Sequence, residues 1–299
     1  MGRTFEVLVS GVGFTEGPVF TQNGEVIFVS PDRGTLYAVS DRGPEVFANV
    51  GGAPVGATEG ADGAIYITQS PKRKSGSMTG GIQRIRDDSF IEWVSMDPIS
   101  PNDLCFGPDG HLWVTDPTWH RPGGEYDSRL WRIDVETEHA ELVLTADYYA
   151  NGIGFSLEDD VLYVADTQNK RILRYSLHGH HLGEPEVFAQ TRNGVPDGFA
   201  FDAEGNLMVA VISTEPPGDS AHGTLQVFDR SGTLAEMLEP RRGRVITNVA
   251  IGPDGRVVAA NPHDRTVRTP GRAPLAIEKG AIIQTMWDYP GLALHPFRR

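Results

Sequence analysis

The chain has 299 residues, of which 39% are hydrophobic and 22% charged. This composition is typical of a soluble globular protein. Forty acidic against 26 basic side chains give a formal net charge of −14, which argues against nucleic acid or an anionic membrane surface as a partner. The single cysteine, Cys105, excludes an internal disulfide and favours a cytoplasmic location. We expect neither a signal peptide nor a membrane span, because no suitable apolar run occurs.

A polar turn followed by a β-rich stretch recurs six times along the chain. The copies are residues 21–30, 60–69, 107–116, 157–166, 202–211 and 252–261. Their turns end 39 to 50 residues apart, a spacing that suits propeller blades of about four strands. We therefore predict an all-β, six-bladed propeller formed by one domain over residues 1–299.

Each repeat also contains the other strands of a blade. A short apolar run precedes each turn, and a third strand follows the second, for example "GTLYAVS" at 34–40 and "RLWRID" at 129–134. The sixth repeat is the weakest, because residues 265–277 are poor strand material. We expect residues 5–10 and 281–289 to share in closing the ring.

Four polar residues occupy one register at the start of the first strand. Glu16, Asn102 and Asp197 stand eight residues before their turn, and Asn151 stands nine before its turn. Strand alternation points all four to the same side, and the propeller brings these strand starts together at the central channel, opposite the polar turns. Asn-Gly and Asp-Gly pairs also form ordinary turns, but four residues in one register favour a site. Carboxylate and amide oxygens suit calcium or magnesium.

The ordered motifs at 15–20, 100–117, 150–167 and 195–211 resemble the gluconolactonase, regucalcin and senescence-marker-protein superfamily, with diisopropyl-fluorophosphatase as a relative. The resemblance implies a six-bladed propeller that holds one divalent metal ion in its channel. Calcium is the first candidate, with zinc, magnesium, manganese or iron as alternatives. By the same resemblance Glu16, Asn151 and Asp197 are metal ligands, Asn102 is a fourth ligand or a substrate contact, and Asp197 is also the general base.

The implied reaction is lactone hydrolysis, in which the metal polarises the ring carbonyl and Asp197 takes a proton from the attacking water. Asp103 is an alternative base, although strand alternation points its side chain away from the channel. Regucalcin-like members carry an arginine two residues before the Asn-Asp pair, where this chain has Ser100. Sugar-acid lactones remain the leading substrates.

The long loops at 68–81, 115–128 and 212–223 are expected on the metal face, where they would set specificity. The candidate substrate contacts are Asn102, Asp103, Asp116, Trp119, His120, Tyr126 and His222. Each of the loop residues among them has the alternative of being an ordinary exposed side chain.

We therefore predict a metal-dependent lactonase whose partner is a small-molecule lactone, with no nucleic-acid or membrane partner. A related metal-dependent esterase or organophosphate hydrolase is the first alternative, and a non-catalytic binding propeller is the second. The sequence leaves the native metal and the oligomeric state open.

Overall fold

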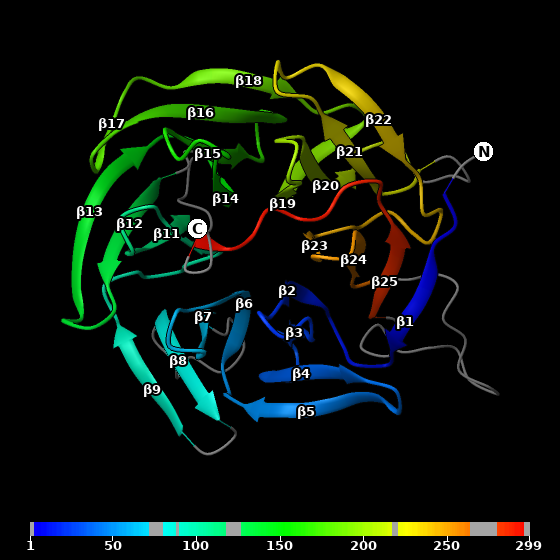
Figure 1. Cartoon of the computed structure of the whole chain (residues 1–299), viewed down its shortest axis with the longest axis horizontal. Helices are drawn as coiled ribbons and strands as arrows, with labels where there is room; N and C mark the ends of the chain where they lie inside the picture. Colours follow the sequence, from blue (N-terminus) through cyan, green and yellow to red (C-terminus); the bar gives the residue numbers. More distant parts are fainter. Residues whose placement is uncertain are drawn as a thin grey trace.

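The structure is a computed structural model that describes residues 3–71, 80–87, 90–117, 127–216, 221–263 and 280–295. Six antiparallel sheets stand around a central axis (Figure 1). This arrangement confirms the predicted all-β, six-bladed propeller. Across the described ranges, no helix has the length and apolar character needed to cross a membrane.

Each sheet is one blade, and its strands run from the channel outward. Blade 1 is β2 (Glu16–Phe20), β3 (Val26–Ser30), β4 (Thr35–Ser40) and β5 (Gly43–Asn49). Blade 2 is β6 (Ala53–Glu59), β7 (Ile65–Ser70), β8 (Gly81–Asp87) and β9 (Phe90–Ser95). Blade 3 is β10 (Leu104–Phe106), β11 (Leu112–Pro117), β12 (Ser128–Asp134) and β13 (His139–Ala146).

The remaining three blades follow the same plan. Blade 4 is β14 (Ala150–Phe155), β15 (Val161–Asp166), β16 (Arg171–His178), β17 (His181–Leu182) and β18 (Glu186–Gln190). Blade 5 is β19 (Gly194–Phe201), β20 (Leu207–Ser213), β21 (Thr224–Phe228) and β22 (Leu234–Leu238). Blade 6 is β23 (Asn248–Ile251), β24 (Arg256–Asn261), β25 (Ala281–Met286) and β1 (Glu6–Ser10).

The two ends of the chain close the ring together, as the sequence predicts. The N-terminal strand β1 is the outer strand of blade 6 and pairs antiparallel with β25, with Glu6 opposite Gln284 and Ser10 opposite Ala281. The third strand of this blade is therefore β25. Joining both ends in one blade fastens the first blade to the last.

Apolar side chains fill the spaces between neighbouring blades. Trp113 of β11 is fully buried and meets Phe155 of β14 edge to face, with ring centroids 5.5 Å apart. Tyr66 of β7 meets Phe106 of β10 in the same way at 5.2 Å. Aromatic side chains on second strands thus contact the inner strand of the next blade, so each blade depends on its neighbour for its core.

Several inner strands are irregular at their start. In β2, Glu16 pairs with Val29 but Val19 pairs with Ile27, so one extra residue lies in the inner strand. The strands β6, β14 and β19 carry the same register shift at the equivalent place. Such β-bulges re-aim side chains and break the simple alternation of a strand. They lie at the level where the sequence places the metal ligands.

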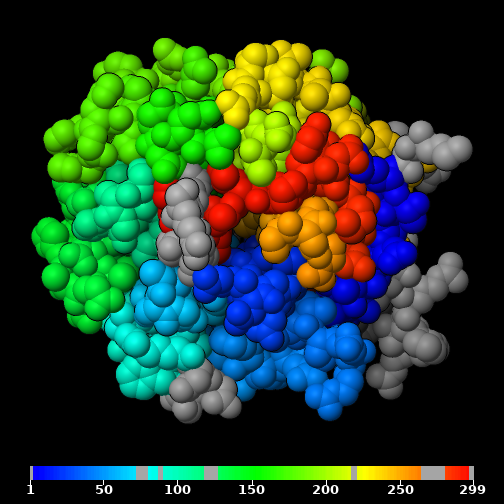
Figure 2. Space-filling view, in the orientation of Figure 1, coloured from blue at the N-terminus to red at the C-terminus, as the bar shows by residue number. Residues whose placement is uncertain are grey.

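The C-terminal segment 287–295 leaves blade 6 and crosses the turn-side end of the channel (Figures 1 and 2). The amide of Gly291 donates to the carbonyl of Gly252 at 2.9 Å, and the amide of Leu292 donates to the carbonyl of Phe201 at 3.0 Å. His295 then reaches blade 4, where its Nε2 lies 2.9 Å from Asp159. The segment is thereby attached to blades 4, 5 and 6.

Because β1 closes the ring, substitution of a buried residue just before β1 should strongly lower the stability of the propeller. Phe5 is buried in the apolar cluster of blades 5 and 6, together with Leu225 and Ile283. Phe5→Ala should lower the free energy of unfolding by about 3–5 kcal/mol, because a buried aromatic side chain is lost. The exposed Val46→Ala should change it by less than ~0.5 kcal/mol in the same urea titration. Equal effects of the two substitutions would contradict the closure.

Candidate functional site

Three carboxylates meet in the channel, one from each alternate blade. Glu16, Asp103 and Asp197 come from blades 1, 3 and 5, and each is no more than 8% exposed. Burial, and secondarily the charge of Asp197, raise the pKa of Glu16 well above its ordinary value. Burial and the charge of Asp103 do the same to the pKa of Asp197. These mutual effects show that the three groups share one electrostatic site.

Neutral polar side chains from the intervening blades bind these carboxylates. The side chain of Asn151, in blade 4, hydrogen-bonds Asp197. Thr247 and Asn248 of blade 6 hydrogen-bond Glu16 and Asp103 respectively. The structure therefore brings Glu16, Asn151 and Asp197 together, as their common register predicts.

The charge balance of this group fits a bound cation. Within the described residues, no Lys, Arg or His forms an ion pair with Glu16, Asp103 or Asp197, and none lowers their pKa. Buried carboxylates without a counter-charge are costly, and a divalent ion would supply one. Over the same residues, no three His, Cys, Asp or Glu side chains are arranged to hold a metal by themselves. An ion here would therefore draw on amide oxygens, and Asn151 is placed to offer one.

Asn102 lies at the start of blade 3, but its side chain does not bond the other three predicted ligands. Its amide donates to the hydroxyl of Tyr149 at 3.3 Å, and its backbone carbonyl accepts from Thr68 at 2.6 Å. The role of Asn102 as a ligand or substrate contact stays a prediction.

Asp103 points into the channel, so the expectation that it faces away is wrong. The regular strand β10 begins only at Leu104, so period-two alternation does not apply to the two residues before it. The Asp103 carboxylate accepts hydrogen bonds from the amides of Leu104, at 2.9 Å, and Ile153, and from the side chain of Asn248. Burial nevertheless raises the pKa of Asp103 to about 7.

Two threonines on second strands join adjacent blades at the level of the site. The Thr115 hydroxyl accepts from the amide of Asp103 at 3.0 Å and donates to the carbonyl of Asn151 at 2.7 Å. The Thr68 hydroxyl accepts from the amide of Gly56 at 2.7 Å and donates to the carbonyl of Asn102. Sequence reasoning missed both, although each stands five residues after the glycine of its turn.

The Asn-Gly pair at 151–152 is not an ordinary turn, since it lies within the inner strand β14. A Cβ atom on Gly152 would lie 2.6 Å from the backbone oxygen of Asp197. Only glycine lets the two inner strands approach this closely. The glycine beside each ligand residue thus contributes to the convergence of the ligands.

Asp116 is not available to a substrate, contrary to its predicted role. It is fully buried, and its carboxylate accepts from the amides of Ile99 and Ser100 at 3.1 and 2.7 Å. It also accepts from Arg129 Nε at 2.9 Å and Trp131 Nε1 at 3.0 Å. Four hydrogen bonds use its acceptor capacity, so Asp116 instead fixes the segment that leads to Asn102.

His222 lies beside the third long loop, and its Nδ1 atom is buried with no hydrogen-bond partner among the described residues. The role of His222 as a substrate contact stays a prediction. The other predicted loop contacts, Trp119, His120 and Tyr126, lie outside the described residues.

The comparisons with known proteins agree with the propeller fold. The family model described as "SMP-30/Gluconolactonase/LRE-like region" matches residues 14–258. The chain belongs to this family. A gluconolactonase of Zymomonas mobilis is 24% identical over 296 residues, which cover 88% of this chain and 80% of that protein.

Two solved structures share the fold at low sequence identity. The Xanthomonas campestris gluconolactonase is 19% identical with a TM-score of 0.71, covering 96% of this chain and 89% of that one. The calcium-binding protein regucalcin of Agrobacterium tumefaciens is 19% identical with a TM-score of 0.74, covering 100% and 98%.

The contacts of Thr115 predict that removal of its hydroxyl weakens metal binding at the site. Thr115→Val should leave the amide of Asp103 and the carbonyl of Asn151 without their partner, at about 1–3 kcal/mol of unfolding free energy. It should also weaken calcium binding measured by calorimetry, because it displaces Asn151. The matched control Thr35→Val removes a hydroxyl bonded within blade 1. The control should bind calcium as the wild type does, and equal affinities in all three proteins would contradict the coupling.

The raised pKa values predict how pH acts on the metal-free protein. In the folded state Glu16, Asp103 and Asp197 keep protons that the unfolded chain releases near pH 4. Their contribution to stability is therefore complete below about pH 4 and is lost as pH rises through the folded pKa, about 7 for Asp103. Calcium needs the charged forms. Thermal scans should show a larger calcium-induced rise in Tm at pH 8 than at pH 5, and the opposite order would contradict the site.

Proposed function

We propose that the protein is a divalent-metal-dependent lactonase that hydrolyses a small lactone, in the first place a sugar-acid lactone. The observation that carries the proposal is the group of three buried carboxylates, supported by amide side chains and without a protein counter-charge. A propeller that only binds other proteins has no need of such a costly group in its channel. The gluconolactonase relatives support the choice of lactones.

A divalent ion at this site, calcium in the first place, would act as a Lewis acid on the lactone carbonyl. Glu16, Asn151 and Asp197 would hold it, with Asn102 as a fourth candidate. Asp197 would also take the proton of the attacking water. Burial raises the pKa of Asp197, which is the direction a base working near neutral pH requires, whereas a bound cation would lower it again. Asn151, which bonds Asp197, would fix the orientation of the base.

The reaction balances with water alone. The water oxygen forms a bond to the carbonyl carbon, the bond from that carbon to the ring oxygen breaks, and the ring oxygen takes up a proton to give the hydroxy acid.

Asp197 is a better base than Asp103. The carboxylate of Asp103 already accepts from Leu104, Ile153 and Asn248, whereas Asp197 bonds only Asn151 among the described side chains.

The remaining assignments follow from the same proposal. The partner is a small-molecule lactone, and His222, with its unpartnered Nδ1, is the described loop residue that could bond a substrate hydroxyl. We propose a cytoplasmic location because the one cysteine of the chain cannot form an internal disulfide.

A substrate panel tests the activity. Sugar lactones, aliphatic lactones, aryl esters and phosphotriesters should be compared with and without a chelator. We expect chelator-sensitive turnover that is fastest on a sugar lactone. Turnover of esters or phosphotriesters without any lactone hydrolysis would instead identify the esterase or organophosphate hydrolase and reject the proposal.

Single substitutions separate the base from its neighbours. Asp197→Asn should lower kcat/KM on the best lactone by about 10²–10⁴-fold, because it removes the base and a ligand. Asp103→Asn keeps an acceptor oxygen for the amides of Leu104 and Ile153 and should have a smaller effect. The exposed control Glu45→Gln should leave the rate unchanged. A larger loss for Asp103→Asn than for Asp197→Asn would move the base to Asp103.

A further inference from the structure

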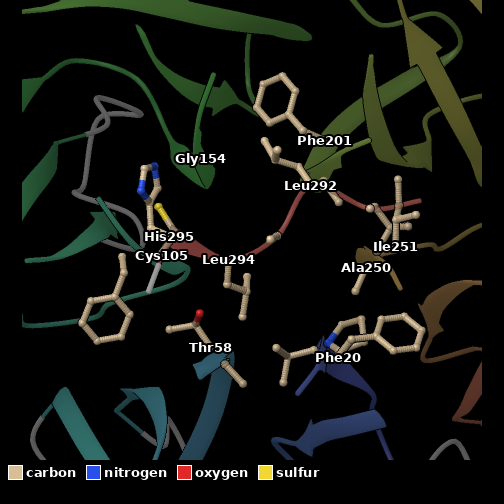
Figure 3. Close-up of a pocket in the computed structure, with 18 of the residues that line it drawn as sticks. Phe20, Thr58, Cys105, Gly154, Phe201, Ala250, Ile251, Leu292, Leu294 and His295 are labelled. Atoms are coloured by element: carbon tan, nitrogen blue, oxygen red, sulfur yellow. The ribbon is translucent and has the colours of Figure 1, made fainter. Parts of the chain in front are cut away.

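The turn-side half of the channel contains an apolar cavity of about 300 Å³ (Figure 3). Its walls are largely hydrocarbon, and the inner strands of four blades contribute phenylalanine rings. The rings belong to Phe20, Phe106, Phe155, Phe199 and Phe201. Well-packed protein cores contain few voids larger than a water molecule. A cavity of this size is therefore a formed pocket and not a packing defect.

The C-terminal segment forms the outer wall of this cavity. Figure 3 shows Leu292 and Leu294 on this segment among Phe20, Phe201 and Thr58 of the inner strands. Leu292 packs against the apolar cluster of Phe199 and Phe201. His295 contacts the edge of Phe155, with ring centroids 5.5 Å apart. Apolar side chains thus border the space both on the side of the C-terminal segment and on the side of the inner strands.

The polar residues at which the cavity borders the charged site are already paired with each other. Asp103 and Asn248 line the cavity and hydrogen-bond one another. The Asn248 Oδ1 accepts from the amide of Val249 at 2.8 Å, and Asp103 accepts from Leu104 and Ile153. The side chains of Asp103 and Asn248 therefore need no hydrogen bond from a ligand.

The residues that line the cavity also disfavour charged ligands. None of the described residues that line the cavity is a Lys or Arg. His295, the lining residue that can carry a positive charge, already lies 2.9 Å from Asp159. An anion would therefore meet the Asp103 carboxylate without a free compensating charge. A cation would lose its hydration among hydrocarbon walls while the carboxylate nearest to it already accepts three hydrogen bonds. A neutral apolar molecule has neither penalty.

We propose that this half of the channel binds a small neutral apolar molecule of one to two aromatic rings. An apolar cavity of about 150 Å³ is enough to bind benzene, and the cavity here has about twice that volume. The cavity borders the charged site at the Asp103–Asn248 pair, but the predicted ligands Glu16, Asn151 and Asp197 are not among its lining residues. It does not depend on the proposed lactonase activity.

The only cysteine of the chain provides a direct reporter. Cys105 is half-buried and lines the cavity close to the C-terminal segment (Figure 3). A ligand in the cavity should shield this thiol from alkylation by N-ethylmaleimide, and intact-mass spectrometry of the full chain measures the rate. Toluene at ten times its midpoint concentration should slow alkylation about tenfold, as expected for single-site occupancy. The charged analogues benzoate and benzylammonium should not slow it at equal concentration.

A substitution that fills the cavity tests the location of the site. Ala250 lines the cavity, and Ala250→Leu should abolish toluene binding measured by ligand-detected NMR. Thr58→Leu, on another wall, should do the same. The matched control Ala235→Leu is on an exposed position of β22 and should bind toluene as the wild type does. Each variant should keep the calcium-induced rise in Tm, which shows that it is folded and that its metal site is intact.

Three results would overturn the proposal. One is unchanged toluene binding in both folded cavity variants. Another is protection of Cys105 by benzoate or benzylammonium as strong as that by toluene. The third is binding only after removal of residues 296–299, which include Phe297, because the chain's own C-terminus would then be the occupant of the cavity.

Discussion

The burial of three carboxylates around one axis is the constraint on which the rest of this structure depends. Glu16, Asp103 and Asp197 repel one another and are removed from water, and both effects raise the pKa of Glu16 and Asp197. Neutral hydrogen-bond donors reduce the cost, but no described cation removes it. A propeller can assemble such a group because each blade contributes only one strand to the axis. A divalent ion would be the simplest counter-charge, and it would turn an unfavourable group into a centre that can polarise a carbonyl.

The second strands and the inner-strand glycines hold this group in place. Thr115 links the backbone of Asp103 to that of Asn151, so the positions of two site residues from different blades are coupled by one hydroxyl. Gly152 lets the inner strand of blade 4 approach Asp197. Asp116 fixes the segment before Asn102 with four hydrogen bonds. The precision of the site therefore comes from contacts between blades, and a single blade could not supply it.

The fold could be predicted from the sequence because the turn chemistry repeats, and each turn marks a blade. The positions of Glu16, Asn151 and Asp197 at the channel follow from their spacing of eight or nine residues to the end of the turn. Their role as metal ligands stays a prediction. The orientation of Asp103 was not predicted, because β10 begins two residues later than simple alternation from Asn102 assumes. The structural role of Asp116 depends on Arg129 and Trp131 of the next strand, which no local pattern reveals. The C-terminal segment over the cavity has no periodicity from which its course could be predicted.

The channel thus has two halves of opposite character, a charged half and an apolar half, which meet at the Asp103–Asn248 pair. The proposed lactonase activity requires the charged half to hold a metal ion. A crystal structure of the protein grown with saturating calcium tests this claim most directly. We predict one ion bound by the side-chain oxygens of Glu16, Asn151 and Asp197 at about 2.3–2.6 Å. An ion bound elsewhere, or a channel in which Glu16 and Asp197 remain uncoordinated at saturating calcium, would contradict a metal site in this half of the channel.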